Sequence, residues 1–413
     1  MRIAVIGGGI SGMASAWLLS REHQVDLYEA NAYVGGHTHT HDVSSNGRPY
    51  AVDSGFIVFN PENYPLLSRL FAELGVDSQP TTMSFAVHDE ASGFEYGTTT
   101  VDALFCQRRN LLSPAFYGMV RDITRFYRES PALLETTDAG PTLGEYLREH
   151  RYGAMFRDRH IVPMASALWS SPSDKVLDFP ARYLVQFMTN HHMLQIEGRP
   201  QWRVVRGGSA RYVDALRKRW NVTERIACPV HEVHRHADGV EVVSLLGSER
   251  YDQVVLACHS DEALAMLADP TPAEREVLGA IRYQENDTVL HTDTRLLPTR
   301  RKAWSAWNVL IPASTTEACT VTYCMNLLQS LDARDTFCVS LNCTDRIAPD
   351  KILRRMRYAH PEYSHASVAA QQRKGEIQGK DRTWYAGAYW GWGFHEDGMR
   401  SAVEVTRALG VSW

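Results

Sequence analysis

The sequence predicts an α/β protein of two lobes, the first of which is assembled from separated stretches of chain. Two observations lead to this fold class. The chain opens with a strand-like run, a glycine-rich turn and a helix-like run, and it closes with a second glycine-rich turn followed by another helix-like run. The 413 residues, 44% of them hydrophobic, can fill two large cores.

The first element is RIAVIGGGISG at residues 2–12, a short apolar strand that ends in a glycine turn. MASAWLLSRE follows with helical spacing, and QVDLYEA is a second strand. Gly7, Gly9 and Gly12 form G-x-G-x-x-G, the pattern of a Rossmann-like dinucleotide-binding unit. We expect Gly7 to permit the tight turn, Gly9 to admit a pyrophosphate and Gly12 to allow close helix packing.

The residues around this turn complete the predicted nucleotide site. Ile10 and Ser11 begin the helix, whose free N–H groups and positive dipole end favour phosphates. Glu29 ends the second strand and is followed by Ala30. We expect the Glu29 carboxylate to accept hydrogen bonds from ribose hydroxyls, and its charge disfavours the 2′-phosphate of NADP.

The next segment distinguishes flavin from nicotinamide. It contains the pair Gly35-Gly36 and then Asp53-x-Gly55, a spacing that resembles the flavin-containing amine oxidase and phytoene desaturase superfamily. The resemblance implies that the first turn binds the ADP half of FAD and that the paired glycines pass along the pyrophosphate and ribityl chain. It places these residues at the cofactor: Gly35, Gly36, His37, Thr38, Gly55 and Phe56. His37 stands where the family often has arginine.

Residues 385–402, YAGAYWGWGFHEDGMRSA, resemble the last flavin motif of the same superfamily. The resemblance implies that Gly387 and Ala388 lie at the cofactor and that Gly398 and Met399 open a helix whose N–H groups face the flavin ring. Phe394 and His395 are implied at the reactive ring, as candidate catalytic residues. Ala388 replaces the family's usual acid. A closer resemblance is to bacterial flavoproteins with GFHEDG near their ends, often assumed to act on lipids.

The middle of the chain completes the division into domains. GGSARYVDAL resembles another element of the superfamily, which implies that the backbone near Val230 lies against the adenine. Residues 252–257 are predicted to return a strand to the first sheet. We expect an FAD-binding domain from residues 1–85, 196–280 and 376–413. A discontinuous substrate domain, with a mixed sheet and helices, takes residues 86–195, mostly helical, and 281–375, mostly strand.

Metal-site alternatives are weak. His37, His39 and His41 alternate and could share one face of an extended segment, but no carboxylate motif accompanies them. Cys319/Cys324 and Cys338/Cys343 are each five residues apart, which places the partners on opposite faces of a strand. We therefore expect buried thiols and no metal site.

Three functions remain open. We expect an FAD-dependent oxidoreductase that desaturates or isomerises a small hydrophobic substrate, fatty-acyl or another lipid, by hydride transfer to flavin. Amine oxidation is the alternative, although the strand expected at 282–293 lacks the family's lysine and no aromatic residue lies between Tyr363 and Trp384. A non-catalytic flavin-binding protein is the third. No cysteine lies near the closing motif, so FAD should be noncovalent. Trp169, Phe187 and either His191 or His192 are expected in the substrate cavity.

Composition limits the partners. The 43 basic and 48 acidic residues give a net charge of −5, which does not favour nucleic acid. The seven cysteines and the immediate first strand predict a cytoplasmic protein. Basic and aromatic residues interleave at 105–129 and 148–160, so peripheral contact with the inner membrane is a further expectation. Oxygen, a quinone and a carrier protein all remain open as electron acceptors.

Overall fold

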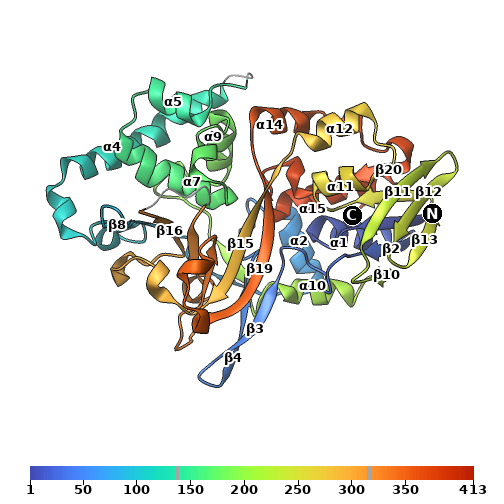
Figure 1. The fold of residues 1–413 in the computed structure, drawn as a ribbon, viewed down its shortest axis with the longest axis horizontal. Helices are drawn as coiled ribbons and strands as arrows, with labels where there is room; N and C mark the ends of the chain where they lie inside the picture. The colour runs from blue at the N-terminus through green and yellow to red at the C-terminus, as the bar shows by residue number, and fades with distance from the viewer. Residues whose placement is uncertain (136–138, 314–318) are drawn as a thin grey trace.

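The computed structural model describes residues 1–135, 139–313 and 319–413. Figure 1 shows two lobes joined at a waist, with both termini in the right-hand lobe. A five-stranded sheet forms the centre of that lobe, in the order β10-β2-β1-β14-β20, and all neighbouring strands are parallel. Its strands are β1 (Arg2–Ile6), β2 (Gln24–Tyr28), β10 (Val222–Arg225), β14 (Gln253–Leu256) and β20 (Thr383–Tyr385). The first and last strands of the chain thus share one sheet.

Helices cover this parallel sheet. Helix α1 lies centrally and packs against α15, so the two ends of the chain are in contact. The apolar residues of both helices belong to one buried cluster. The helices of this lobe are α1 (Ile10–Leu19), α2 (Pro65–Leu74), α10 (Ala210–Arg217), α11 (Ser260–Met266), α12 (Pro272–Gly279) and α15 (His395–Ala408). An antiparallel meander, β11 (Val230–His236), β12 (Gly239–Ser244) and β13 (Gly247–Tyr251), flanks the sheet.

The left-hand lobe contains a seven-stranded mixed sheet in the order β19-β15-β18-β17-β16-β7-β8. Six neighbouring pairs build it, of which β16–β7 is parallel and the others are antiparallel. Its strands are β7 (Phe85–Asp89), β8 (Phe94–Gly97), β15 (Tyr283–His291), β16 (Trp307–Ile311), β17 (Val321–Cys324), β18 (Cys338–Leu341) and β19 (Ile352–Pro361).

A group of helices stands above this mixed sheet in Figure 1. Phe116, Phe126, Phe156 and Phe187 are buried in its core, together with side chains of β7 and β16. The longer helices are α4 (Pro114–Glu129), α5 (Leu143–Glu149), α7 (Val162–Trp169) and α9 (Ala181–Asn190). The shorter ones are α3 (Val101–Leu104), α6 (Ala154–Phe156) and α8 (Ser173–Val176). Helix α13 (Met325–Leu328) does not belong to this group, because it connects β17 to β18 and packs with Val52 and Val204.

Small elements connect the lobes. The hairpin of β3 (Thr40–Ser45) and β4 (Arg48–Asp53) extends below the waist in Figure 1. A three-stranded sheet, β5-β9-β6, joins segments that are far apart in the sequence: β5 (Val58–Phe59), β6 (Ser78–Pro80) and β9 (Arg203–Val205). Helix α14 (His365–Gln372) falls within the expected substrate segment 281–375 but packs on α12 of the parallel-sheet lobe.

Two predictions from the sequence, a mostly helical segment and buried thiols, can be compared with the structure. The expectation that residues 86–195 are mostly helical misses the β7–β8 hairpin, whose turn residues Ala91–Gly93 separate two short apolar runs. Cys319, Cys324, Cys338 and Cys343 are buried free thiols, as expected, although only Cys324 and Cys338 lie within strands, β17 and β18. Burial raises the pKa of Cys319 to about 12 and that of Cys343 to about 11.

Candidate functional site

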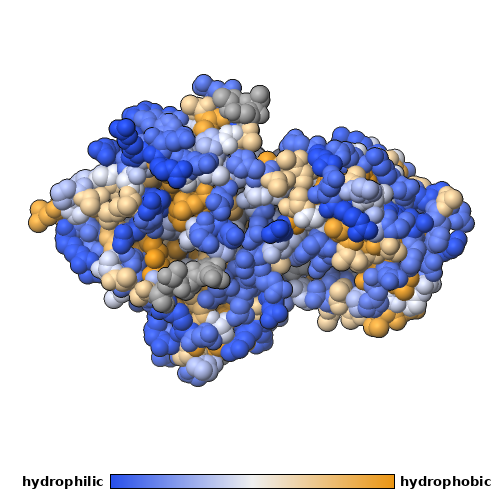
Figure 2. Space-filling view, turned by 45° about the horizontal axis from the view of Figure 1, so that its top comes forward, coloured by the Kyte–Doolittle hydropathy of each residue, from blue (hydrophilic) through white to orange (hydrophobic). Residues whose placement is uncertain are grey.

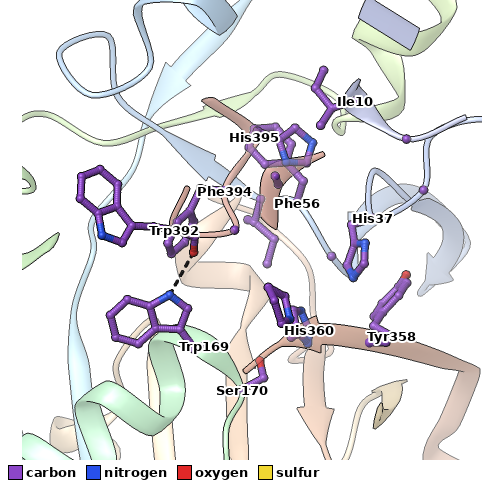
Figure 3. A pocket seen from close by; sticks show the side chains of 18 of the residues that line it. Ile10, His37, Phe56, Trp169, Ser170, Tyr358, His360, Trp392, Phe394 and His395 are labelled. Atoms are coloured by element: carbon purple, nitrogen blue, oxygen red, sulfur yellow. Dashed lines mark hydrogen bonds between the residues drawn. The ribbon is translucent and has the colours of Figure 1, made fainter. Parts of the chain in front are cut away.

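A single cavity of about 1170 Å³ runs between the lobes. Its walls come from both ends of the chain, from the first glycine turn and the closing motif, and from the helices and mixed sheet of the other lobe. In Figure 3, His37, Phe56, Tyr358, His360 and Phe394 surround this shared space. A cavity with a glycine-lined end and an aromatic end can take a ligand of two chemically different parts.

The glycine-lined end is built on the β1–α1 turn. Gly7 has a φ of +105°, and a Cβ there would lie 2.7 Å from the Ala257 carbonyl oxygen. A Cβ on Gly12 would lie 1.8 Å from the carbonyl oxygen of Gly7, so Gly12 allows the helix to approach the turn. Gly9 differs from both, because a Cβ there would have no neighbour within 4 Å. Gly9 therefore faces the cavity, at the amino end of α1.

Glu29 organises the same end. It is 5% exposed and lines the cavity at the carboxyl end of β2. Its Oε2 accepts a hydrogen bond from the Gly8 N–H at 2.8 Å, and its Oε1 accepts one from the Asn31 N–H at 2.7 Å. Ala30 and Val230 line the cavity beside it. The carboxylate thus fixes the turn and also borders the open space.

The paired glycines form a second loop against the first. Gly35 and Gly36 have φ values of +141° and +58°, and the Gly35 N–H donates to the Gly8 carbonyl at 2.9 Å. A Cβ on Gly36 would lie 3.0 Å from the Gly9 Cα. A side chain at Gly36 would therefore separate the two loops, whereas a Cβ on Gly35 would lie 2.4 Å from the Thr38 carbonyl oxygen within the second loop.

His37 follows the paired glycines and lines the cavity. Its ring lies near those of Tyr358 and His360, with centroid distances of 5.0 and 5.2 Å. Its Nε2 has no hydrogen-bond partner among the described residues. Burial, and then the neighbouring histidines, hold the pKa of His37 well below its usual value. A neutral ring with a free nitrogen therefore faces the space.

The closing motif corrects one prediction. Helix α15 begins at His395, with Phe394 as its N-cap, so Gly398 and Met399 lie inside the helix and not at its start. The Gly398 N–H already donates to the Phe394 carbonyl at 3.1 Å, and Met399 is fully buried. The N–H groups that precede the first intrahelical bond belong to His395 and Glu396. Gly398 instead permits packing, because a Cβ there would lie 2.7 Å from Ile10 Cγ2.

The two acids of GFHEDG account for the position of this helix start. The Glu396 carboxylate accepts from the N–H groups of Leu66 and Leu67, at the amino end of α2. The Asp397 carboxylate accepts from the N–H groups of Trp392 and Phe394. Burial raises the pKa of Glu396 to about 7 and also raises that of Asp397. Both acids orient the backbone around the motif.

The two candidate catalytic residues occupy opposite sides of the motif. The His395 ring stacks on Phe56 at 3.7 Å between centroids, and its Nε2 lies 3.0 Å from Thr38 Oγ1. Burial lowers the pKa of His395 to about 3. The Phe394 ring stacks on Phe187 at 5.2 Å. Both Phe394 and His395 line the cavity, whereas Thr38 is buried behind it and orients His395.

The aromatic end of the cavity lies under α7 and α9. Trp169 and Phe187 line it as predicted, and the Trp169 indole N–H donates to the Trp392 carbonyl at 3.0 Å. His191 also lines it, and burial lowers the pKa of its ring to about 4. His192 does not line it, and its Nε2 lies 2.6 Å from Glu62 Oε1 instead. Of the two histidines expected in the substrate cavity, His191 is therefore the one that lines it.

Most predicted cofactor residues meet at this one cavity. Its lining includes Gly7, Gly9, Ile10, Ser11, Glu29, Ala30, Gly35, Gly36, His37, Gly55, Phe56, Val230, Gly387 and Ala388. Gly12, Thr38, Gly398 and Met399 do not line it. Their places are in the packing behind the wall.

Sequence reasoning missed several lining residues, among them Ser170, Tyr358, His360 and Trp392. Trp392 alone carried a readable signal, since it lies inside the glycine-rich closing motif. Ser170 ends α7 with a φ of +53°, and Tyr358 and His360 lie on β19. None of these three belongs to a local pattern.

The residues fit a flavin dinucleotide. The open face of Gly9 and the start of α1 suit a pyrophosphate. His37 and Trp392 line the cavity, and the His37 Nε2 and the Trp392 indole N–H are buried without partners among the described residues, so a polar ligand could satisfy them. No group of three or more His, Cys, Asp or Glu within the described ranges could bind a metal ion.

Comparison with known proteins supports this assignment. The sequence family described as flavin containing amine oxidoreductase matches residues 10–307. AofH of Mycobacterium tuberculosis, named as a flavin-containing monoamine oxidase, is 26% identical over 281 residues, 65% of this chain and 59% of AofH. The match thus spans less than two thirds of that relative's length.

Solved structures share the fold over nearly the whole chain. A fatty acid isomerase from P. acnes that produces CLA has a TM-score of 0.67 at 16% identity and covers 98% of both chains. A putrescine oxidase bound to putrescine has a TM-score of 0.68 at 14% identity and covers 99% of both. Together with the family match, the glycine turns and the shared cavity show that the chain belongs to the family of flavin-containing amine oxidoreductases.

Proposed function

We propose that the protein is a flavin-dependent oxidoreductase that binds FAD noncovalently. The glycine-lined end of the cavity would bind the ADP half, and the end formed by Phe56, Phe394 and His395 would receive the flavin ring. The closing motif itself contains no cysteine. Cys228 and Cys258 line the cavity, but they lie beside Glu29 and Gly7, at the end proposed for the ADP half. Family membership and the fit of the lining residues support this proposal.

The proposed substrate is a hydrophobic chain, desaturated or isomerised next to the flavin. The main observation behind this proposal is the apolar wall of the cavity beyond Phe394. Its apolar residues are Met164, Leu168, Trp169, Phe187, Trp307 and Leu341. Such a wall stabilises an apolar chain by burial, at about 25 cal/mol for each Å² removed from water. The fold is shared with a fatty acid isomerase.

When bound, FAD would supply the hydride acceptor. The chain's own residues have three tasks in this scheme. The first N–H groups of α15 offer hydrogen bonds to negative charge, with the helix dipole behind them. The stacked rings of Phe394 and Phe187 orient an apolar substrate and exclude water. The neutral rings of His395 and His191 can donate or accept a hydrogen bond without adding charge to this apolar region.

Amine oxidation is the second candidate, and family membership favours it. Against it, β15 contains no lysine, and the family's amine oxidases use a lysine on the corresponding strand. Phe394 and Trp392 could nevertheless border an amine, so substrate tests must include amines.

Reduction of the bound flavin in the absence of oxygen distinguishes the lipid substrate from an amine substrate. We expect unsaturated fatty acids or phospholipids to bleach the flavin absorbance, and primary amines and polyamines to leave it unchanged. Bleaching by amines alone would replace the lipid proposal with amine oxidation. Bleaching by dithionite alone would favour a binding protein without turnover.

Glu29→Ala is expected to weaken FAD binding by about 1–3 kcal/mol, because the ribose would lose its acceptor and Gly8 its partner. Glu29→Gln keeps one oxygen that can accept a hydrogen bond from the Gly8 N–H. Its FAD affinity should therefore lie between those of Glu29→Ala and the wild type. Titration of the apoprotein with FAD measures both constants. Equal affinity in all three proteins would remove Glu29 from the site.

Peripheral membrane contact remains a proposal for one of the two expected segments. Leu111, Leu112 and Tyr117 are exposed at the start of α4, near Arg108 and Arg109, and Figure 2 shows apolar side chains at this end of the molecule. In residues 148–160 Phe156 is buried, so that segment offers less apolar surface. Among the described residues, no helix combines the length and apolarity needed to cross a bilayer. Leu112→Asp should reduce co-sedimentation with anionic vesicles.

A further inference from the structure

We propose that Arg199, Tyr127 and His160 form a subsite for the anionic head group, carboxylate or phosphate, of an apolar-chain substrate. This inference rests on the proposed lipid substrate and deepens it. All three side chains line the cavity, and they come from separate elements of the helical lobe. Tyr127 lies on α4, His160 lies in a π-helical turn (Arg157–Ile161), and Arg199 lies in the loop between α9 and β9.

Arg199 supplies a positive charge without an acidic partner. Its Nε donates to the Gln195 carbonyl at 2.8 Å, and its guanidinium also hydrogen-bonds the Tyr127 hydroxyl. No ion pair of Arg199 with a carboxylate occurs within the described parts of the chain. By contrast Arg357, another arginine of the cavity wall, lies 3.8 Å from Glu285. Arg199 is solvent-exposed, so its place is at the mouth of the cavity.

His160 supplies a buried group that lacks a partner. It is 3% exposed, its Nδ1 lies 2.9 Å from the Tyr96 hydroxyl, and its Nε2 has no hydrogen-bond partner within the described ranges. Burial, and then the charge of Arg199, lower the pKa of His160 to about 3, so the ring is neutral near pH 7. The Tyr96 hydroxyl donates to the Arg159 carbonyl at 2.9 Å, so Nδ1 of the neutral His160 ring donates to Tyr96 and the unpartnered Nε2 is an acceptor.

Arg199 and Tyr127 therefore offer two donors to one ligand. A guanidinium and a phenol can both donate to the oxygens of one carboxylate or phosphate, and the neutral His160 ring beside them adds no negative charge. π-Helical turns are rare and are frequent at functional sites, which agrees with the position of His160. Phe187 and Trp169 lie deeper in the same cavity, next to Phe394. An anion fixed at Arg199 would thus set which part of the attached chain reaches the flavin end.

The test compares ligands that share a chain and differ in the head group. Quenching of tryptophan fluorescence measures binding of oleate, oleyl alcohol and oleoyl lysophosphatidate to the FAD-loaded protein, independently of turnover. We expect wild type to bind an anionic ligand more tightly than the alcohol. Arg199→Gln should weaken anion binding by about tenfold or more, and Tyr127→Phe by about threefold, while alcohol binding changes by less than about twofold.

Arg48→Gln is the matched control, because Arg48 is an exposed arginine on β4 outside the cavity wall, and it should leave all three constants unchanged. A loss confined to oleate identifies the carboxylate as the head group, and a loss confined to lysophosphatidate identifies the phosphate. Equal losses for alcohol and anions, or no loss, would overturn the subsite while the lipid proposal stands. Failure of wild type to bind any of the three ligands would overturn both.

Discussion

Gly9→Val is expected to yield a folded, colourless protein with FAD affinity reduced by at least about 100-fold. The backbone of Gly9, with φ −73° and ψ −177°, is accessible to valine, and an added Cβ meets no atom within 4 Å. The valine methyl groups would instead occupy the cavity at the amino end of α1, where the pyrophosphate is expected. Loss of glycine at this N-cap should cost the apoprotein no more than about 1 kcal/mol.

The measurement combines flavin absorbance after gentle purification, FAD titration and thermal unfolding of the apoprotein. Gly118→Val is the matched control, because a Cβ on this α4 glycine is equally free of neighbours but lies outside the cavity wall. It should remain yellow. A yellow Gly9→Val protein with unchanged affinity would show that phosphates do not bind at the first turn.

Local backbone chemistry explains what could be predicted. Gly7 and Gly12 stand where a side chain would collide with backbone atoms, and such requirements leave a short, readable pattern. The strand–turn–helix order at residues 2–19 and the returning strand at 253–256 follow from it. The same logic explains the error at the closing motif. The Asp397 carboxylate accepts from the Phe394 N–H and so begins α15 at His395, a capping signal present in the sequence.

Contacts between distant segments could not be predicted in this way. Glu396 caps α2 across about 330 positions, and His37 meets Tyr358 and His360 only because β19 passes behind the second loop. No local spacing encodes such pairs, since any buried aromatic or histidine could satisfy the same pattern. The head-group subsite is of this kind, with Tyr127, His160 and Arg199 on three separate elements.

Acid sensitivity is the second large effect that we expect. Burial lowers the pKa of His41, His191 and His291 to about 4 and that of His160 to about 3, whereas an unfolded histidine titrates near 6.5. Below pH 6.5 the unfolded chain therefore binds protons that the folded protein does not, and stability falls with pH. Each histidine contributes a loss of roughly 2 kcal/mol between pH 7 and pH 5.

Two buried acids act in the opposite direction. Burial raises the pKa of Glu396 to about 7 and that of Asp53 to about 6, so both take up protons in the folded protein as pH falls, which adds stability. Burial also lowers the pKa of His360 to about 4 and that of His395 to about 3. These six histidines exceed the two acids, and the balance is a loss of roughly 8 kcal/mol. We expect Tm to be lower at pH 5 than at pH 7 by between about 5 and 15 °C.

His291→Asn separates this cause from general acid effects. His291 is fully buried outside the cavity wall, where its Nε2 lies 2.8 Å from Ser340 Oγ and its Nδ1 accepts from the Asp293 N–H. The variant should be less stable than wild type at pH 7, because part of this hydrogen bonding is lost. Its Tm should nevertheless change less between pH 7 and pH 5, since one proton-binding group of the unfolded chain is gone. Two results would contradict the assignment of acid sensitivity to buried neutral histidines. One is a difference in Tm between pH 7 and pH 5 that is the same in His291→Asn as in the wild type, and the other is a wild-type Tm that rises on acidification.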